Sequence, residues 1–172
     1  MAEKTNAASN IAKGGLLTTM GVILIYISSI VPLNQGFILA LSSLLIPLAV
    51  LITNLKNAFT VYAATSLLSL LICGLKITVI AYIIFFGLYG FTKYYIEKLR
   101  KLPFEIILKL VFFNLCTVLL LLIYSLFFPG LLKINFHFYI IIAGWQIAFL
   151  IYDYLLTLFI NYINKYLAKG LK

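Results

Sequence analysis

The sequence predicts an all-α membrane protein: a bundle of six transmembrane helices with both termini in the cytoplasm. Apolar residues make up 65% of the 172 residues, charged residues make up 10%, and the mean hydropathy is +1.16. These values lie far outside the range of soluble domains. Apolar runs of about 20 residues, long enough to cross a bilayer, recur along the chain, and basic residues flank them unevenly. We expect one transmembrane domain covering residues 1–172.

Turn-forming residues separate the apolar runs. The segments "VPLNQG", "NLKN", "CGLK" and "FFPGLLKIN" follow the first, second, third and fifth runs, and Pro, Gly and Asn in such clusters favour turns. Pro47 falls inside the second run and predicts a kink near Ser43. Residues 93–105 are expected to form a cytoplasmic loop before Pro103 starts a new helix. The predicted helices cover residues 14–31, 36–53, 57–73, 76–92, 103–128 and 136–160.

The distribution of basic residues predicts the orientation. If the six helices alternate in direction, only Lys76 and Lys133 among the 13 Lys and Arg residues lie on the side opposite to the N-terminus. Because basic residues are retained in the cytoplasm, both termini are predicted to lie inside. We expect a multi-pass protein of a plasma membrane, of bacterial origin. The basic residues are dispersed between apolar runs, so the lipid bilayer is an expected partner and nucleic acid is not.

Residues for the common kinds of catalysis are missing. The sequence has one His and four acidic residues, and it contains no Ser-His-Asp set, Gly-rich phosphate loop or Walker-type Lys. Its two cysteines, Cys73 and Cys116, fall in apolar runs without metal-ligand spacing. The sequence therefore predicts two free thiols, and it predicts no enzyme activity, no cofactor and no metal site.

One carboxylate, Asp153, lies inside the sixth apolar run. Helical spacing puts Asp153 on the same face as Gln146 and Thr157, so it is expected to face the bundle. A lone charge at the bilayer centre costs about 2.5–3.5 kcal/mol, so Asp153 needs a partner. Lys109, about two turns into the fifth helix, lies at a compatible depth. The sequence predicts an ion pair between Lys109 and Asp153, and a proton or cation site at Asp153 is the alternative.

Polar and aromatic side chains are predicted to gather in the outer half of the bundle. Such groups among apolar walls are typical of a pocket for a small, partly apolar solute. The predicted substrate-binding residues are Lys76, Tyr82, Asn114, His137, Trp145 and Gln146, and the third helix adds Ser66 and Ser69. The other interpretation is structural, because Trp and Tyr anchor helix ends at the interface and Ser and Thr hold helices together.

Two small residues, Ala8 and Ala12, lie one turn apart before the first helix, within "AASNIAKGGLLTTMGVILIYISSIVP". Small residues at this spacing allow a second helix to come close. A six-helix chain of this length, with this start and no ATP site, resembles the S components of energy-coupling factor transporters, which are vitamin-binding membrane subunits. It is also similar to small six-helix membrane proteins of Firmicutes over "IIFFGLYGFTKYYIEKLRKLPFEIILKLVFFN".

The resemblance implies a function in transport. The chain would be a solute-binding component that captures a small micronutrient from outside, and it would dock on a transmembrane coupling subunit that carries two ATPases. The resemblance assigns Ala8 and Ala12 to the contact with that subunit. The alternative, from another class, is a non-transporting scaffold or envelope protein that acts through helix–helix contacts.

Overall fold

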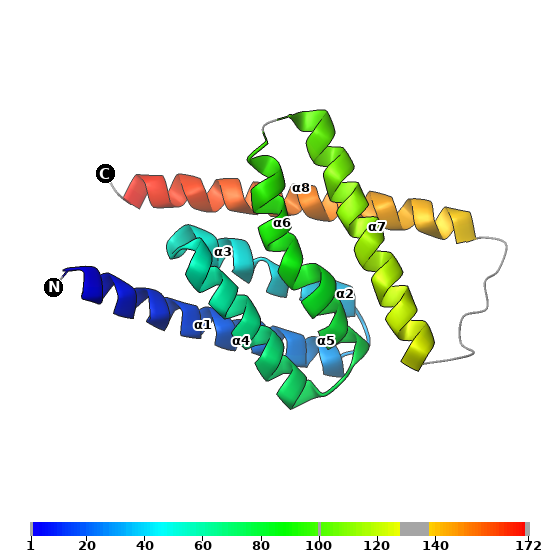
Figure 1. Ribbon diagram of the computed structural model, residues 1–172, viewed down its shortest axis with the longest axis horizontal. Helices are drawn as coiled ribbons and strands as arrows, with labels where there is room; N and C mark the ends of the chain where they lie inside the picture. The colour runs from blue at the N-terminus through cyan, green and yellow to red at the C-terminus, as the bar shows by residue number, and fades with distance from the viewer. Residues whose placement is uncertain (1, 100, 128–137, 171–172) are drawn as a thin grey trace. The chain divides into compact units, whose positions relative to one another are not determined.

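The computed structural model describes residues 2–99, 101–127 and 138–170, with side chains between 8 and 166 except at 100, 102 and 128–143. The described residues are almost entirely helical, and none of them lies in a β-strand. The elements are α1 (Ala2–Ile30), α2 (Gln35–Ser43), α3 (Leu45–Ile52), α4 (Leu55–Cys73), α5 (Ile77–Ala81), η1 (Tyr82–Phe86), α6 (Gly87–Glu97), α7 (Leu102–Phe127) and α8 (Phe138–Gly170) (Figure 1).

Six segments of this described part are long and apolar enough to span a membrane. They are Ala8–Ile30, Gln35–Ile52, Leu55–Cys73, Ile77–Glu97, Pro103–Phe127 and Gly144–Tyr166. The predicted all-α class is confirmed, and the number of segments suited to span a membrane agrees with the six predicted helices. The predicted sixth helix ends too early, because α8 continues past residue 160 to Gly170. Its predicted start at residue 136 lies outside the described residues.

The chain divides into two compact units, Met1–Tyr95 and Ile96–Lys172. The first unit contains α1 to α5, η1 and all of α6 except its last two residues. The second unit contains those two residues, α7 and α8. That the whole chain forms a single transmembrane domain stays a prediction.

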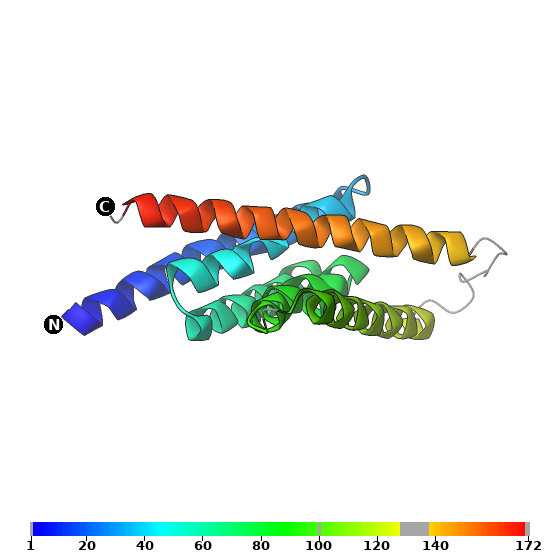
Figure 2. The same cartoon turned by 90° about the horizontal axis from the view of Figure 1, so that it is seen from above.

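Glycines of α1 bring this helix close to α4 in the first unit. The two helices run in the same direction, because α2 and α3 return the chain between them (Figures 1 and 2). A Cβ atom added at Gly14 would lie 2.9 Å from Asn57 Nδ2, and one added at Gly21 would lie 2.9 Å from Thr65 Cγ2. The Asn57 amide also donates to the Asn10 carbonyl at 2.8 Å. The α1–α4 interface is therefore both close and partly polar.

The second spanning segment is broken at Leu44, between α2 and α3. Pro47 lacks a backbone N–H, so it cannot donate to the Ser43 carbonyl, and its ring displaces that carbonyl. The hydroxyls of Ser42 and Ser43 donate to the carbonyls of Leu39 and Ala40 at 2.7 and 2.6 Å. The kink predicted near Ser43 is confirmed.

The turns of the first unit follow their local chemistry. Asn34 and Gly74 have φ values of 66° and 72°, in the left-handed region that Asn and Gly tolerate best. Asn54 caps α4, because its side chain accepts a hydrogen bond from the Asn57 backbone N–H at 2.7 Å. These residues let one spanning helix end and the next begin within a few residues.

The fourth spanning segment contains the π-helical stretch η1 between α5 and α6. The Ile83 carbonyl in this stretch accepts a hydrogen bond from the Tyr62 hydroxyl of α4 at 2.9 Å. Gly87 follows η1 directly and lies against the Tyr62 ring, since an added Cβ would come 2.5 Å from Tyr62 Cε2. Tyr62 therefore holds α4 against the irregular part of the fourth segment. The sequence did not predict η1.

The loop predicted between the helices at 76–92 and 103–128 is shorter in the structure. α6 continues to Glu97 and α7 begins at Leu102, so residues 93–97 are helical and only residues 98–101 separate the two helices. The prediction was wrong because polarity suggested a loop, although residues 92–97 contain no Gly or Pro to end the helix. Glu97 is therefore the last residue of a helix and not part of a loop.

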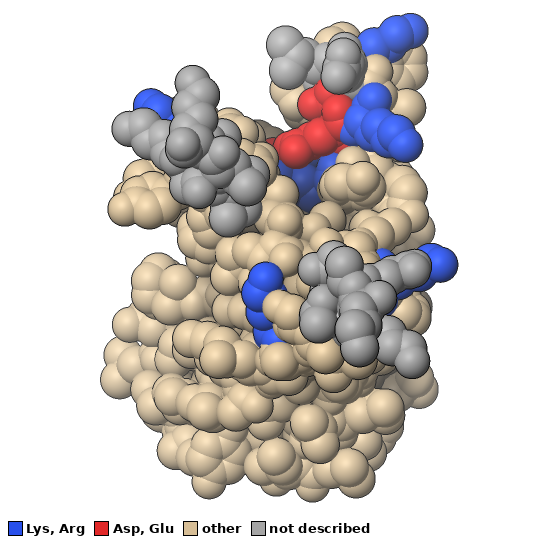
Figure 3. Space-filling view, turned by 90° about the vertical axis from the view of Figure 1, so that its left-hand side faces the viewer, with Lys and Arg blue, Asp and Glu red and all other residues tan. Residues whose placement is uncertain are grey.

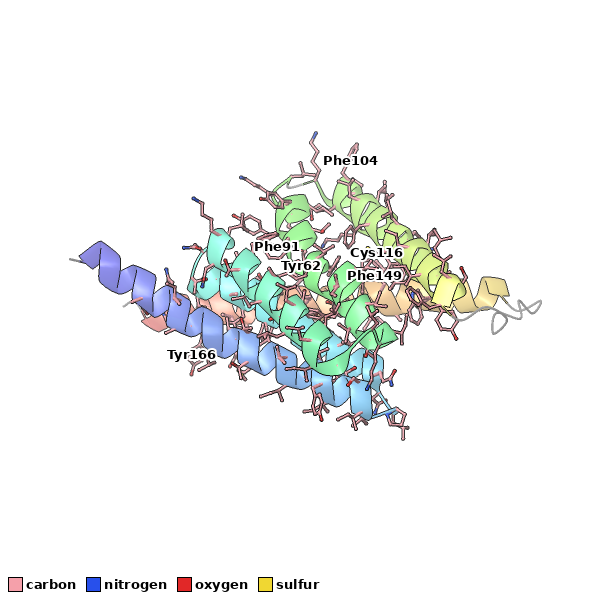
Figure 4. The ribbon with its side chains drawn as sticks, turned by 60° about the horizontal axis from the view of Figure 1, so that its bottom comes forward. Tyr62, Phe91, Phe104, Cys116, Phe149 and Tyr166 are labelled. Atoms are coloured by element: carbon pink, nitrogen blue, oxygen red, sulfur yellow. The ribbon has the colours of Figure 1, made fainter. Side chains whose placement is uncertain are left out.

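Stacked aromatic rings join α7 and α8 in the second unit. The rings of Phe113 and Phe149 are nearly parallel, with centroids 4.4 Å apart. Cys116 of α7 lies beside Phe149 (Figure 4) and is buried. Cys73 and Cys116 are both free thiols, as predicted.

Candidate functional site

Three charged side chains of the second unit meet at Lys109. The Lys109 Nζ lies 2.9 Å from Asp153 Oδ2 and 2.9 Å from Glu97 Oε1. The Lys109, Asp153 and Glu97 side chains are 7%, 15% and 32% exposed, respectively. The predicted contact between Lys109 and Asp153 is present. We call Glu97, Lys109 and Asp153 the charge cluster, and Figure 3 shows acidic and basic side chains in direct contact on one face.

Glu97 gives Lys109 a second carboxylate, which the sequence did not predict. An ammonium group has three protons, so it can donate to both carboxylates at once. Lys93 precedes Glu97 by four residues on α6, which puts both on one face of that helix, and the Lys93 side chain is buried. The spacing of Lys93 and Glu97 was the available signal for a helix here. The cluster has the composition of a structural ion network, because each of its charges has an opposite charge close by.

Asn114 and Gln146, both predicted to bind solute, are brought together in the second unit. Gln146 Nε2 lies 3.4 Å from Asn114 Oδ1, and Asn114 Nδ2 donates to the Leu110 carbonyl at 2.8 Å. Trp145 is 58% exposed and stacks loosely on Phe113, with centroids 6.4 Å apart. Asn114 is exposed near the middle of α7. Polar groups at such positions are rare in hydrocarbon unless something covers them.

Lys76 and Tyr82 belong to the first unit, where each has a packing role. The Lys76 Nζ donates to the Ser29 carbonyl at 3.3 Å, and a cation is favourable at this C-terminal end of α1. Tyr82 is 1% exposed and packs with Ile25, Leu39 and Val79. Tyr82 is therefore enclosed by its own unit. Lys76 stabilises a helix end as well as offering a charge.

Four hydroxyl groups of the first unit are buried without a hydrogen-bond partner. We call these residues the hydroxyl cluster: Thr65, Ser66, Ser69 and Thr78. Three of them lie on α4, and the fourth lies in the first turn of α5. Thr65, Ser66 and Ser69 lie within a stretch of five residues of α4, and Thr78 lies one turn before Tyr82, whose hydroxyl lies near that of Thr65.

The surroundings of the hydroxyl cluster are also hydroxyl-bearing. The Tyr82 hydroxyl lies near that of Thr65, and the Tyr62 hydroxyl lies near that of Ser66, but neither contact satisfies the Thr65 or Ser66 oxygen. Thr65 also faces α1 at Gly21. The cluster thus lies among α1, α4, α5 and the start of η1. Ser66, Ser69 and Tyr82 were predicted for a pocket, whereas Thr65 and Thr78 were not.

Other hydroxyls of the described residues show what is usual in this protein. Most donate to a backbone carbonyl three or four residues earlier, as is common for Ser and Thr in membrane helices. Those that do are Thr18, Thr19, Ser29, Ser42, Ser43, Thr53, Thr60, Thr92, Thr117, Ser125 and Thr157. The four hydroxyls of the cluster depart from this arrangement together.

The remaining predicted positions lie at the start of α1 and before α8. Ala8 and Ala12 are both exposed on α1, and an added Cβ at Gly15, one turn further on, would meet nothing within 4 Å. Ala8, Ala12 and Gly15 therefore form a narrow strip of small residues on α1, next to the exposed side chains of Ile11 and Leu16. His137 lies outside the described residues.

Comparisons with known proteins do not add to this geometry. No protein-family model, no curated protein and no solved structure matches the chain. Within the described residues, no three His, Cys, Asp or Glu side chains are grouped so that they could hold a metal ion.

Proposed function

We propose that the protein is the solute-binding membrane component of a transporter. It captures a small, partly apolar micronutrient from outside and obtains energy from a partner, as the S components of energy-coupling factor transporters do. The observation that carries this proposal is the hydroxyl cluster, four buried hydroxyls without partners in one part of the first unit. A buried polar group left unsatisfied costs about 1–3 kcal/mol, so an occupant that hydrogen-bonds to the cluster recovers a large free energy.

The chemistry of the cluster defines the solute. Hydroxyl groups donate and accept hydrogen bonds but carry no charge, and Tyr82 and Val79 beside them add apolar surface. A small solute with hydroxyl, amide or carboxyl groups on an apolar body fits these properties. Lys76, at the same end of α5, favours a carboxylate. Asn114, Trp145, Gln146 and His137 stay predicted as further solute-binding residues.

The cluster is enclosed, so access for a solute requires α5 to separate from α4. The π-helical stretch η1 lies directly after α5, and π-helical stretches occur often at functional sites. Gly74, with its positive φ, joins α4 to α5. A movement of α5 between Gly74 and η1 opens the cluster without unfolding a spanning helix.

The exposed small face at Ala8 and Ala12 supports docking on a transmembrane coupling subunit that carries the ATPases. Close helix contact needs small side chains, and both alanines are exposed. The described residues that face the clusters offer no catalytic set, so we propose no enzyme activity and no cofactor. The proposed location is a bacterial plasma membrane.

Removing hydroxyls while keeping shape tests solute binding. After purification in detergent, the double variant Thr65→Val and Thr78→Val is expected to retain at least about tenfold less of the small molecule than the wild type. Each lost hydrogen bond contributes about 0.5–1.5 kcal/mol to binding. Mass spectrometry of retained molecules measures this loss. Thr117→Val is the matched control, since the Thr117 hydroxyl bonds to the Phe113 carbonyl. Gln146→Leu tests the predicted role of Gln146 in the same assay.

The scaffold alternative predicts a different result. If no solute occupies the cluster, the double variant removes two unsatisfied polar groups and becomes more stable by about 1–3 kcal/mol for each. Wild-type protein without any retained molecule, together with this gain in stability, would refute solute binding and support a scaffold role.

The proposed orientation, with both termini inside, is tested by cysteine labelling. Leu33 and Leu99 are 76% and 53% exposed, and they lie in turns at opposite ends of spanning segments. In a variant without Cys73 and Cys116, an impermeant maleimide is expected to label Leu33→Cys in intact cells. It should label Leu99→Cys only after permeabilisation. The reverse result would place the termini outside.

A further inference from the structure

We propose that the groove between α4 and α6 in the first unit binds one anionic phospholipid. The groove has a volume of about 470 Å³ and is lined by Leu55, Lys56, Phe59, Leu88, Phe91 and Tyr95. This volume falls in the range of small-molecule sites. The inference stands independently of the proposed function, because the groove and the hydroxyl cluster share no residue.

The walls of the groove suit an acyl chain. Phe59 is 60% exposed, and its ring centroid lies 6.0 Å from that of Phe91 across the groove. Tyr62 supports both rings from behind, at 6.1 and 5.9 Å, and Figure 4 shows Tyr62 beside Phe91. α4 and α6 both lie in segments long and apolar enough to span a membrane, so we infer that this aromatic surface meets hydrocarbon. The apolar part of the groove thus provides a rigid surface for a lipid tail.

One end of the groove suits an anionic headgroup. Lys56 is exposed in the first turn of α4, where the helix dipole also favours a negative charge. Its ammonium has no hydrogen bond or ion pair within the part of the chain that the structure describes. Tyr95, 57% exposed at the same end, has the amphipathic character of an interfacial anchor. None of the lining residues is acidic.

The arrangement distinguishes a lipid from other occupants. A free anion would have only one basic side chain to bind, and its other neighbours would be apolar. An apolar transmembrane helix would leave the Lys56 charge at the end of the groove without a partner. A phospholipid has a charged headgroup and apolar tails, which match Lys56 at one end of the groove and the apolar side chains along the rest of it. Charge complementarity at Lys56 therefore favours an anionic phospholipid over a zwitterionic one.

Lipid binding to the purified full-length protein tests the proposal, with native mass spectrometry as the readout. Wild-type protein is expected to bind dioleoyl phosphatidylglycerol about fivefold more tightly than dioleoyl phosphatidylcholine, as expected for one basic residue near an anionic group. Lys56→Gln should abolish the preference, whereas the control Lys101→Gln, another exposed lysine, should retain it. Leu88→Trp should weaken binding of both lipids by filling the groove.

Several outcomes would overturn the proposal. A preference for phosphatidylglycerol that survives in Lys56→Gln would place the lipid elsewhere. Displacement of phosphatidylglycerol by inorganic phosphate at millimolar concentration would show a site for free anions. If a cysteine at Phe59, in a variant without Cys73 and Cys116, crosslinks in native membranes to another protein, the groove is a helix-docking surface instead. Unchanged lipid binding in a folded Leu88→Trp protein would exclude the groove as the site of the acyl chain.

Discussion

Replacing Lys109 with Met is expected to lower the free energy of unfolding by up to about 3–5 kcal/mol, because it leaves two partly buried carboxylates without their shared cation. Lys109 Nζ lies 2.9 Å from both Asp153 and Glu97. Asp153→Asn should cost less, about 1–3 kcal/mol, since Glu97 still pairs with Lys109. Thermal or chemical unfolding in detergent measures both losses.

The interaction is isolated by combining the changes. The triple variant Glu97→Gln, Lys109→Met and Asp153→Asn should recover much of the stability lost in Lys109→Met, because no unpaired charge remains. Lys101→Met is the control, and a change at this exposed site should stay within about 0.5 kcal/mol. Additive losses in the triple variant would show that the three side chains do not act as a unit.

Gly87→Ala is expected to destabilise the first unit by about 1–3 kcal/mol through overpacking. The added Cβ would lie 2.5 Å from Tyr62 Cε2, and Tyr62 cannot move freely because its hydroxyl donates to the Ile83 carbonyl. The ring also contacts Phe59, Tyr82 and Phe91. The shift of Tyr62 therefore disturbs the contact between α4 and η1.

Gly15→Ala is the matched control for this prediction. It makes the same chemical change in a helix, but nothing lies within 4 Å of the added Cβ. Alanine has a higher helix propensity than glycine, so Gly15→Ala should be neutral or stabilising by up to about 1 kcal/mol. Thermal unfolding of the two variants in the same detergent measures the difference. Equal effects at Gly15 and Gly87 would contradict the role assigned to Tyr62.

The pair of Lys109 and Asp153 could be predicted from the sequence, because it follows from the free-energy cost of burying a charge. A carboxylate inside an apolar run requires a partner, and few cations were available at the depth of Asp153, which led to Lys109. Asn114 and Gln146 were both predicted to lie in the outer half of the bundle, from their positions along their helices. Glu97 was missed because its polar neighbours made the residues after Thr92 look like a loop, although α6 continues to Glu97.

The sequence by itself determined that the chain is all-helical, where the six spanning segments lie and that Pro47 breaks the second, because these features depend on local hydrophobicity and backbone chemistry. Only the tertiary structure decided most other contacts between side chains, such as that of Glu97 with Lys109. Whether the hydroxyls of Thr65, Ser66, Ser69 and Thr78 find a carbonyl depends on rotamers and on neighbouring helices. The Tyr62 hydroxyl likewise reaches a carbonyl of η1, that of Ile83, which lies 21 residues away in the sequence. Such contacts join residues distant in sequence, and hydropathy contains no information about them.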